Sequence, residues 1–126
     1  MSKSRFFICA RCGNIVNIVR NGGGSLVCCG EKMKELIPGE VEASAEKHLP
    51  VVRFEDGILH AFVGEVEHPM TEAHNIAWIY LETEKGGEIK YITPDAKPEA
   101  FFNVGNDKPV AVFAYCNLHG LWKTEI

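Results

Sequence analysis

The chain of 126 residues lacks three features that would place it in a special class: a long apolar run, a basic block and a low-complexity stretch. With no run of about 18 apolar residues, we expect no membrane-spanning segment. With no Lys- or Arg-rich block and a net charge of -4, we expect no nucleic-acid binding. Residues 1–8 lack the long apolar core and cleavage site of a secretory signal, so we expect a cytoplasmic protein.

The remaining composition is typical of a small globular protein. Hydrophobic residues make up 46% and charged residues 24%, which argues against a disordered chain. The length suits one ordinary domain or two very small ones. We place a boundary near Pro38-Gly39 and predict a head of residues 1–37 and a body of residues 38–126.

The cysteines are informative because there are five, an odd number. A disulfide framework normally has an even number and forms in an oxidising compartment, so metal ligation or catalysis is favoured. Four of the five lie in the head, whereas all five histidines lie in the body. We therefore expect a sulfur-rich region and a histidine-rich region with different chemistry.

The head is too short to fold readily on an apolar core alone, and a metal would compensate for that. Its pattern predicts a hairpin-like path that brings two cysteine pairs to one point. The expected segments are Phe6–Ile8, Ile15–Val19, a turn at Asn21–Gly24, and Leu26–Val27.

The spacing of the head cysteines favours one metal site. The two-residue gap between Cys9 and Cys12 lets both thiolates reach a tetrahedral metal. Cys28 and Cys29 are adjacent, so they can share that metal only with distortion. Four cysteines suit zinc or iron, and a zinc site that only folds the head is a competing interpretation. An inert cluster of buried thiols is less favoured in so small a region.

The body is expected to be mainly β. Short segments rich in β-branched and aromatic residues follow one another with no helical period of useful length, which predicts a β-sandwich. The expected strands are residues 51–54, 58–66, 76–83, 89–93, 101–104 and 110–115, with turns at Glu55–Gly57, Gly86-Gly87 and Asn106–Pro109.

Histidines near the expected strand ends form a second candidate site. Cys116 and His119 have a two-residue gap that suits two ligands of one metal, although Cys116 alone could be a small core residue. His60 lies in the middle of an expected strand with no partner at ligand spacing, so we expect an ordinary residue there. The candidate ligands are His48, His68, His74, Cys116 and His119.

These motifs resemble the desulfoferrodoxins, the two-iron class of superoxide reductases. The four head cysteines, including the vicinal pair, resemble the desulforedoxin-type domain of that family. The body resembles its catalytic domain, and no expected ligand position departs from the pattern. The motifs that carry this second resemblance are Glu46-Lys47-His48, His68-Pro69-Met70, His74 and Cys116-Asn117-Leu118-His119-Gly120.

The resemblance implies two iron ions per chain. One would be an Fe(Cys)4 centre in the head. The other would be an Fe(His)4(Cys) centre in an immunoglobulin-like body, with four imidazoles in a plane, Cys116 as axial thiolate and an open sixth position. The resemblance also implies reduction of superoxide to hydrogen peroxide without oxygen evolution, a homodimer, and electrons from a rubredoxin-like donor.

Two further residues acquire catalytic roles through the resemblance. Lys47 would attract superoxide, an anion that the net charge repels. Glu46 would cap the open position of ferric iron. From the residues alone, both could equally be solvated side chains.

Two other functions remain open at this point. The chain could be a zinc-bound or electron-transfer protein without catalytic activity, because spacing does not distinguish zinc from iron. Visible colour would distinguish ferric thiolate sites from zinc sites. The chain could also be a dismutase, which would evolve oxygen, whereas a reductase consumes donor electrons.

Overall fold

A computed structural model describes residues 2–126 of the protein and divides the chain into two compact units. Lys3–Ile37 form one unit, which we continue to call the head. Pro38–Ile126, joined by Ser2, form the other, the body. Ser2 belongs with the body because its backbone N–H and its hydroxyl donate hydrogen bonds to the carboxylate of Glu125.

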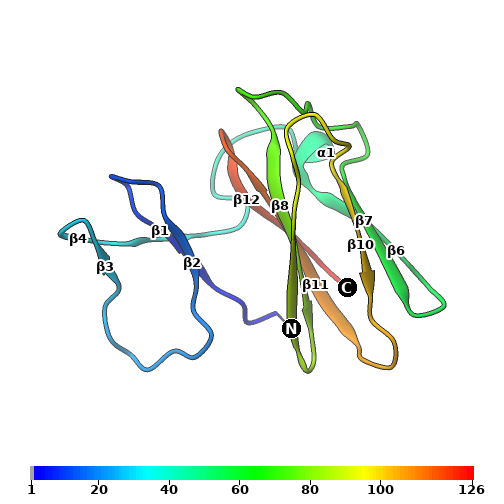
Figure 1. The fold of residues 1–126 in the computed structure, drawn as a ribbon, viewed down its shortest axis with the longest axis horizontal. Helices are drawn as coiled ribbons and strands as arrows, with labels where there is room; N and C mark the ends of the chain where they lie inside the picture. The colour runs from blue at the N-terminus through cyan, green and yellow to red at the C-terminus, as the bar shows by residue number, and fades with distance from the viewer. Residues whose placement is uncertain (1) are drawn as a thin grey trace. The chain divides into compact units, whose positions relative to one another are not determined.

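The head consists of five very short strands in two small sheets (Figure 1). β1 is the central strand of an antiparallel sheet with the order β2-β1-β5, and β3 pairs with β4 in a separate hairpin. The strands are β1 (Phe6–Ile8), β2 (Ile15–Asn17), β3 (Val27–Cys28), β4 (Glu31–Lys32) and β5 (Lys34–Leu36).

The prediction for the head is correct in bringing the two cysteine pairs together and wrong about which strands pair. The two cysteine pairs do meet, but the segment from Ile15 does not pair with the segment around Val27. β4 and β5 were not predicted, and these are the strands that complete the two sheets. Glu31 and Lys32 are exposed and lack the apolar alternation on which strand prediction depends.

The body is a sandwich of two antiparallel sheets, which confirms the predicted fold class. One sheet has three strands in the order β10-β7-β6, and the other has four in the order β12-β11-β8-β9 (Figure 1). The strands are β6 (Pro50–Glu55), β7 (Ile58–Val63), β8 (Ile76–Thr83), β9 (Gly86–Tyr91), β10 (Glu99–Asn103), β11 (Pro109–Cys116) and β12 (Gly120–Glu125).

Several features of the body differ from the sequence expectations. The strand from Ile58 ends at Val63 and not at Val66, and Gly86-Gly87 begin β9 and do not form the turn. β12 was not predicted at all. It follows β11 through a three-residue hairpin loop, and Gly120 closes this loop with a positive φ of 78°.

A one-turn helix, α1 (Ala45–His48), also lies where no helix was expected. The backbone N–H of Leu49 donates to the carbonyl oxygen of Ala45 and closes the turn. The helix ends before Pro50 because a residue that precedes proline disfavours helical backbone. Within residues 2–126, no helix is long and apolar enough to cross a membrane.

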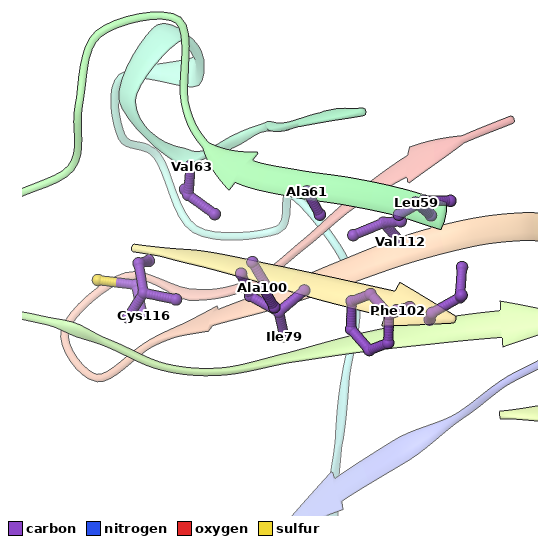
Figure 2. Packing of buried hydrophobic residues seen from close by; sticks show 11 residues of the cluster. Leu59, Ala61, Val63, Ile79, Ala100, Phe102, Val112 and Cys116 are labelled. Atoms are coloured by element: carbon purple, nitrogen blue, oxygen red, sulfur yellow. The ribbon is translucent and has the colours of Figure 1, made fainter. Parts of the chain in front are cut away.

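The core of the body lies between the two sheets (Figure 2). Alternate residues of β7 point inwards: Leu59, Ala61 and Val63 are at most 1% exposed. Cys116 belongs to this cluster and lies at one end of it, with its sulfur pointing away from Ala100 and Phe102. The core therefore places one candidate ligand at the edge of the sandwich.

Candidate metal centres

The four head cysteines converge as the spacing predicted. Their sulfur atoms all lie within 4.8 Å of one another. Cys9 and Cys12 belong to the loop between β1 and β2, and Cys28 ends β3. The sulfur of Cys28 lies 3.6 Å from that of Cys12 and 4.0 Å from that of Cys29. One small cation can therefore contact all four sulfurs.

The vicinal pair shares the site because the backbone turns between the two residues. Cys29 has a positive φ of 54°, a left-handed conformation that is uncommon for residues other than glycine. Gly30 follows with a φ of 77°. This turn brings two adjacent side chains to the same side, which extended backbone would not do. The distortion that the sequence indicated is thus taken up by the backbone.

The head thiols strongly influence each other's protonation. The backbone N–H of Cys12 donates to the Cys9 sulfur, and it lowers the pKa of that thiol to about 7. Hydrogen bonding with Cys12 is the main cause that raises the pKa of Cys29 to about 12, and the pKa of Cys28 is raised in the same way. Four thiolates at these distances need a cation to balance their charge, so the donor set fits iron or zinc.

The candidate ligands of the body come from three segments at one end of the sandwich. His48 ends α1, and His68 and His74 lie in the connection between β7 and β8. Cys116 ends β11, and His119 lies in the hairpin loop that follows. The structure brings all five together: donor atoms of His48, His68, His74 and Cys116 lie within 4.8 Å of one another. The Nδ1 atom of His119 lies 3.8 Å from the Cys116 sulfur.

The four imidazoles form a closed cycle. Neighbouring ring centroids lie 4.7, 4.6, 5.1 and 5.0 Å apart, in the order His48, His68, His74, His119 and back to His48. The interplanar angles between neighbours are 75° to 88°. Across the cycle, the His48 and His74 centroids are 6.4 Å apart. The rings therefore stand at the corners of a four-sided figure with their edges towards its centre.

Nitrogen separations in this cycle match a metal site. The Nε2 atom of His48 lies 3.2 Å from Nε2 of His68 and 3.2 Å from Nδ1 of His119. Two nitrogens bound at right angles to one metal at about 2.1 Å would be about 3 Å apart. The arrangement accommodates a cation with little movement of these rings.

Backbone carbonyls determine which nitrogen faces the centre. Nδ1–H of His48 donates to the Ser44 oxygen at 2.7 Å, and Nδ1–H of His68 donates to the Pro69 oxygen at 2.7 Å. A carbonyl only accepts, so each Nδ1 carries the proton and each Nε2 is a free lone pair. Such outer hydrogen bonds fix the tautomer of metal-ligating histidines.

Burial favours the neutral form of three of these imidazoles, which is the form that binds a metal. It lowers the pKa of His68 to about 4 and is also the main cause that lowers the pKa of His48 and His74. Burial likewise raises the pKa of the Cys116 thiol. The Nε2 atom of His74 is buried without a hydrogen-bond partner among residues 2–126, and a metal would satisfy it. The donor set of four imidazoles and one thiolate therefore fits iron.

One residue near this site had no predicted role. The buried indole of Trp122 on β12 stacks on the His48 ring, with centroids 5.0 Å apart. Its Nε1–H donates to the His119 carbonyl oxygen at 3.1 Å. Trp122 thus supports two ligands at once. Its position three residues after His119 gave no signal, because β12 was not recognised as a strand.

The two expected catalytic residues occupy different surroundings. Lys47 is exposed on α1, and its positive charge contributes to the lowered pKa values of His48 and His74. Glu46 lines a neighbouring groove of about 620 Å³ with Leu49 and Phe54. His60 belongs to neither ligand group and instead lies 2.8 Å from a Glu99 oxygen.

Comparison with known proteins agrees with this geometry. The family profile described as Desulfoferrodoxin matches residues 40–125, and the profile of the desulfoferrodoxin N-terminal domain matches residues 2–36. A desulfoferrodoxin of Nitratidesulfovibrio vulgaris is 46% identical, covering 93% of this chain and 92% of that protein. A desulfoferrodoxin of Syntrophotalea carbinolica is 44% identical, covering 98% and 97%.

A solved structure extends the agreement to the fold. The crystal structure of the superoxide reductase from Treponema pallidum covers 98% of both chains with a TM-score of 0.82 and 32% identity. The cysteine group and the histidine–cysteine group fit the two iron centres of desulfoferrodoxins. The chain belongs to the desulfoferrodoxin family.

Proposed function

We propose that the chain is a superoxide reductase, which reduces superoxide by one electron to hydrogen peroxide at the body site and evolves no oxygen. The observation that carries the proposal is the group of four imidazoles and one thiol at the end of the sandwich. The superoxide reductase from Treponema pallidum, similar over 98% of this chain, supports it.

The proposed ligands differ in the atom that would bind the metal and in charge. His48, His68 and His74 would bind through Nε2 and His119 through Nδ1, while Cys116 supplies a negative charge from the end of the core. Bound iron would supply the electron and a coordination position that the ligand set leaves open. The carbonyls of Ser44 and Pro69 hold two rings in the tautomer that the metal needs.

Lys47 is proposed to attract the substrate. The chain has a net charge of -4 and repels superoxide at long range, so a local positive charge is required. Lys47 directly precedes the ligand His48, is exposed, and its charge acts on two of the ligand histidines. An exposed ammonium beside the open face raises the local concentration of an anion.

Glu46 is proposed to bind ferric iron after the product leaves. Its backbone oxygen accepts a hydrogen bond from the Val66 N–H, which fixes the main chain of α1. Glu46 is exposed and is one of the residues that line the neighbouring groove. Capping would require the carboxylate to reach the metal from this exposed position.

The partners and location are also proposals. We propose a rubredoxin-like electron donor, a homodimer and a cytoplasmic location. Apolar side chains on the head support a subunit contact, because Val19 is 96% exposed and Val27 61% exposed. Sedimentation of the purified protein tests the dimer, and a Val19→Lys variant that lowers its mass would locate the contact on the head.

Metal analysis combined with donor-dependent superoxide consumption tests the main function. We expect two irons per chain, superoxide loss in proportion to donor oxidised, and no oxygen release. Zinc at both sites in active preparations would exclude the proposal. Oxygen evolution with superoxide loss in the absence of donor would show a dismutase instead.

A further inference from the structure

Asn117 lies between the ligands Cys116 and His119 and has no role in the function proposed above. It is exposed, yet its side chain makes two hydrogen bonds to the backbone of another loop. Its Oδ1 atom accepts from the Asn75 N–H at 2.9 Å, and its Nδ2–H donates to the Ala73 oxygen at 3.0 Å. The backbone N–H of Asn117 also donates to the Asn75 oxygen at 3.2 Å.

These bonds join two of the loops that carry ligands. Ala73 and Asn75 flank His74, whereas Asn117 belongs to the hairpin loop of Cys116 and His119. The pairing of β8 with β11 is irregular between Tyr115 and Cys116, where the register shifts. Beyond this point, the side-chain amide of Asn117 replaces a peptide group and continues the contact between the loops.

The loop of His74 is held together as a unit. The backbone N–H of Thr71 donates to the His74 oxygen at 2.9 Å, and the His74 N–H donates to the Thr71 hydroxyl at 3.0 Å. The side chain of the buried Asn75 donates to the Thr71 oxygen at 2.8 Å. The hydrogen bonds of Asn117 to residues 73 and 75 therefore position the whole loop.

We propose that Asn117 is a positioning residue that sets His74 relative to Cys116 and His119. The rings of His48 and His68 are each oriented by an Nδ1–H bond to a carbonyl, whereas the His74 ring is oriented through its loop. Asparagine suits the task because a primary amide accepts and donates at once. Aspartate would keep the acceptor and lose the donor, and alanine would lose both.

The inference rests on the proposed function in one respect, since it requires iron at the body site. The test therefore measures how tightly the protein retains iron and does not depend on activity. Full-length parent, Asn117→Ala, Asn117→Asp and Asn106→Ala are loaded with a Mössbauer-active iron isotope and titrated with a chelator. Mössbauer spectra assign the iron to each centre, since the all-sulfur and mainly nitrogen ligand sets differ. Asn106 is a matched control, exposed in the β10–β11 turn.

We expect Asn117→Ala to lower iron affinity at the body site by about 10- to 100-fold, the usual loss for an outer-shell partner. Asn117→Asp should show a smaller loss, and head iron should be unchanged in every variant. Body-site affinity within about twofold of the parent in both Asn117 variants overturns the role. Equal loss of head and body iron also overturns it, since that pattern indicates general destabilisation. If Asn117→Ala does not fold, the aspartate variant decides.

A failure of the proposed function gives a different result. If the parent holds body iron but consumes no superoxide, the reductase proposal is wrong, while the iron affinities still decide the role of Asn117.

Discussion

The head and the body hold their candidate metals in opposite ways. In the head, Phe6 and Cys9 are the only buried hydrophobic residues among Lys3–Ile37, and one of the two is itself a candidate ligand. In the body, eleven buried residues pack between two sheets, and the candidate ligands lie at the edge of this core. The head is organised around its metal, whereas the body is a folded scaffold to which a metal is added.

This difference explains the difference in ligands. A small region with little apolar burial gains its folding free energy from metal binding, and four thiolates bind zinc or iron strongly. A scaffold that is stable without metal can expose one face of the metal to a substrate. It can also supply neutral imidazoles, whose desolvation costs less than that of four charged thiolates.

Metal removal should reveal the largest difference in stability between the two units. Without metal, we expect the head to lose its fold and the body to keep its sheets, because only the body has an independent core. Hydrogen exchange of the metal-free protein should show unprotected amides in β1 and β5 and protected amides in β8 and β11. Equal protection in both units would refute the contrast.

Loss of one ligand should remove one centre only. We expect Cys12→Ser to abolish iron binding in the head, while the body still reduces superoxide with an artificial donor. The reciprocal change, Cys116→Ser, should abolish activity and leave the head iron. The two measurements are iron content and superoxide consumption. An inactive but folded Cys12→Ser variant would show that the head takes part in the reaction.

A cavity in the core should destabilise the body alone. Phe102 is 0% exposed, so we expect Phe102→Ala to lower the free energy of unfolding of the body by about 3–5 kcal/mol. Its neighbour Phe101 is 57% exposed on the outer face, and Phe101→Ala serves as the control with a much smaller loss. Denaturant unfolding followed by body tryptophan fluorescence gives both values. Similar losses for the two variants would contradict the assigned core.

The positive charge of Lys47 should affect the rate of reaction with superoxide more than a positive charge elsewhere on the body. We expect Lys47→Ile to slow the second-order reaction with superoxide by about 10-fold, the low end of electrostatic steering. Lys85→Ile makes the same charge change in the loop between β8 and β9, at the other end of β8 from the ligands. Pulse radiolysis measures both rates, and the Lys47 effect should shrink at high salt. Equal rates for parent and Lys47→Ile reject the role.

The smallest expected effect is spectroscopic. We expect Glu46→Ala to leave the first encounter with superoxide fast and to change the absorption spectrum of the resting ferric enzyme, because a carboxylate ligand is lost. Glu84→Ala, in the β8–β9 loop, should leave both unchanged. Identical ferric spectra in parent and Glu46→Ala count against ligation by this residue.

The ligand residue types and most body strands could be predicted from the sequence, but several connections could not. The Cys9-x2-Cys12 spacing and the Cys116-x2-His119 spacing are local chemistry, and the strand Ile76–Thr83 was predicted with its observed bounds. The helix α1 and the strand β12 were missed because four residues carry too little periodicity, and β12 follows a turn read only as a ligand motif. The positive φ of Cys29 was anticipated only as an unspecified distortion.

By itself, the sequence determined the kinds of donor atom, their division between sulfur and imidazole, and the β character of the chain. These depend on composition and on spacings of a few residues. Only the tertiary structure decided which nitrogen of each ring faces the centre, which loop carries His74 to Cys116, and that Trp122 supports His48. The bond between Asn75 and Asn117 and the stacking of Trp122 on His48 join residues more than 40 positions apart, and no local pattern encodes them. The bond of His48 to Ser44 spans four residues, but it depends on the helix α1, which the sequence did not reveal.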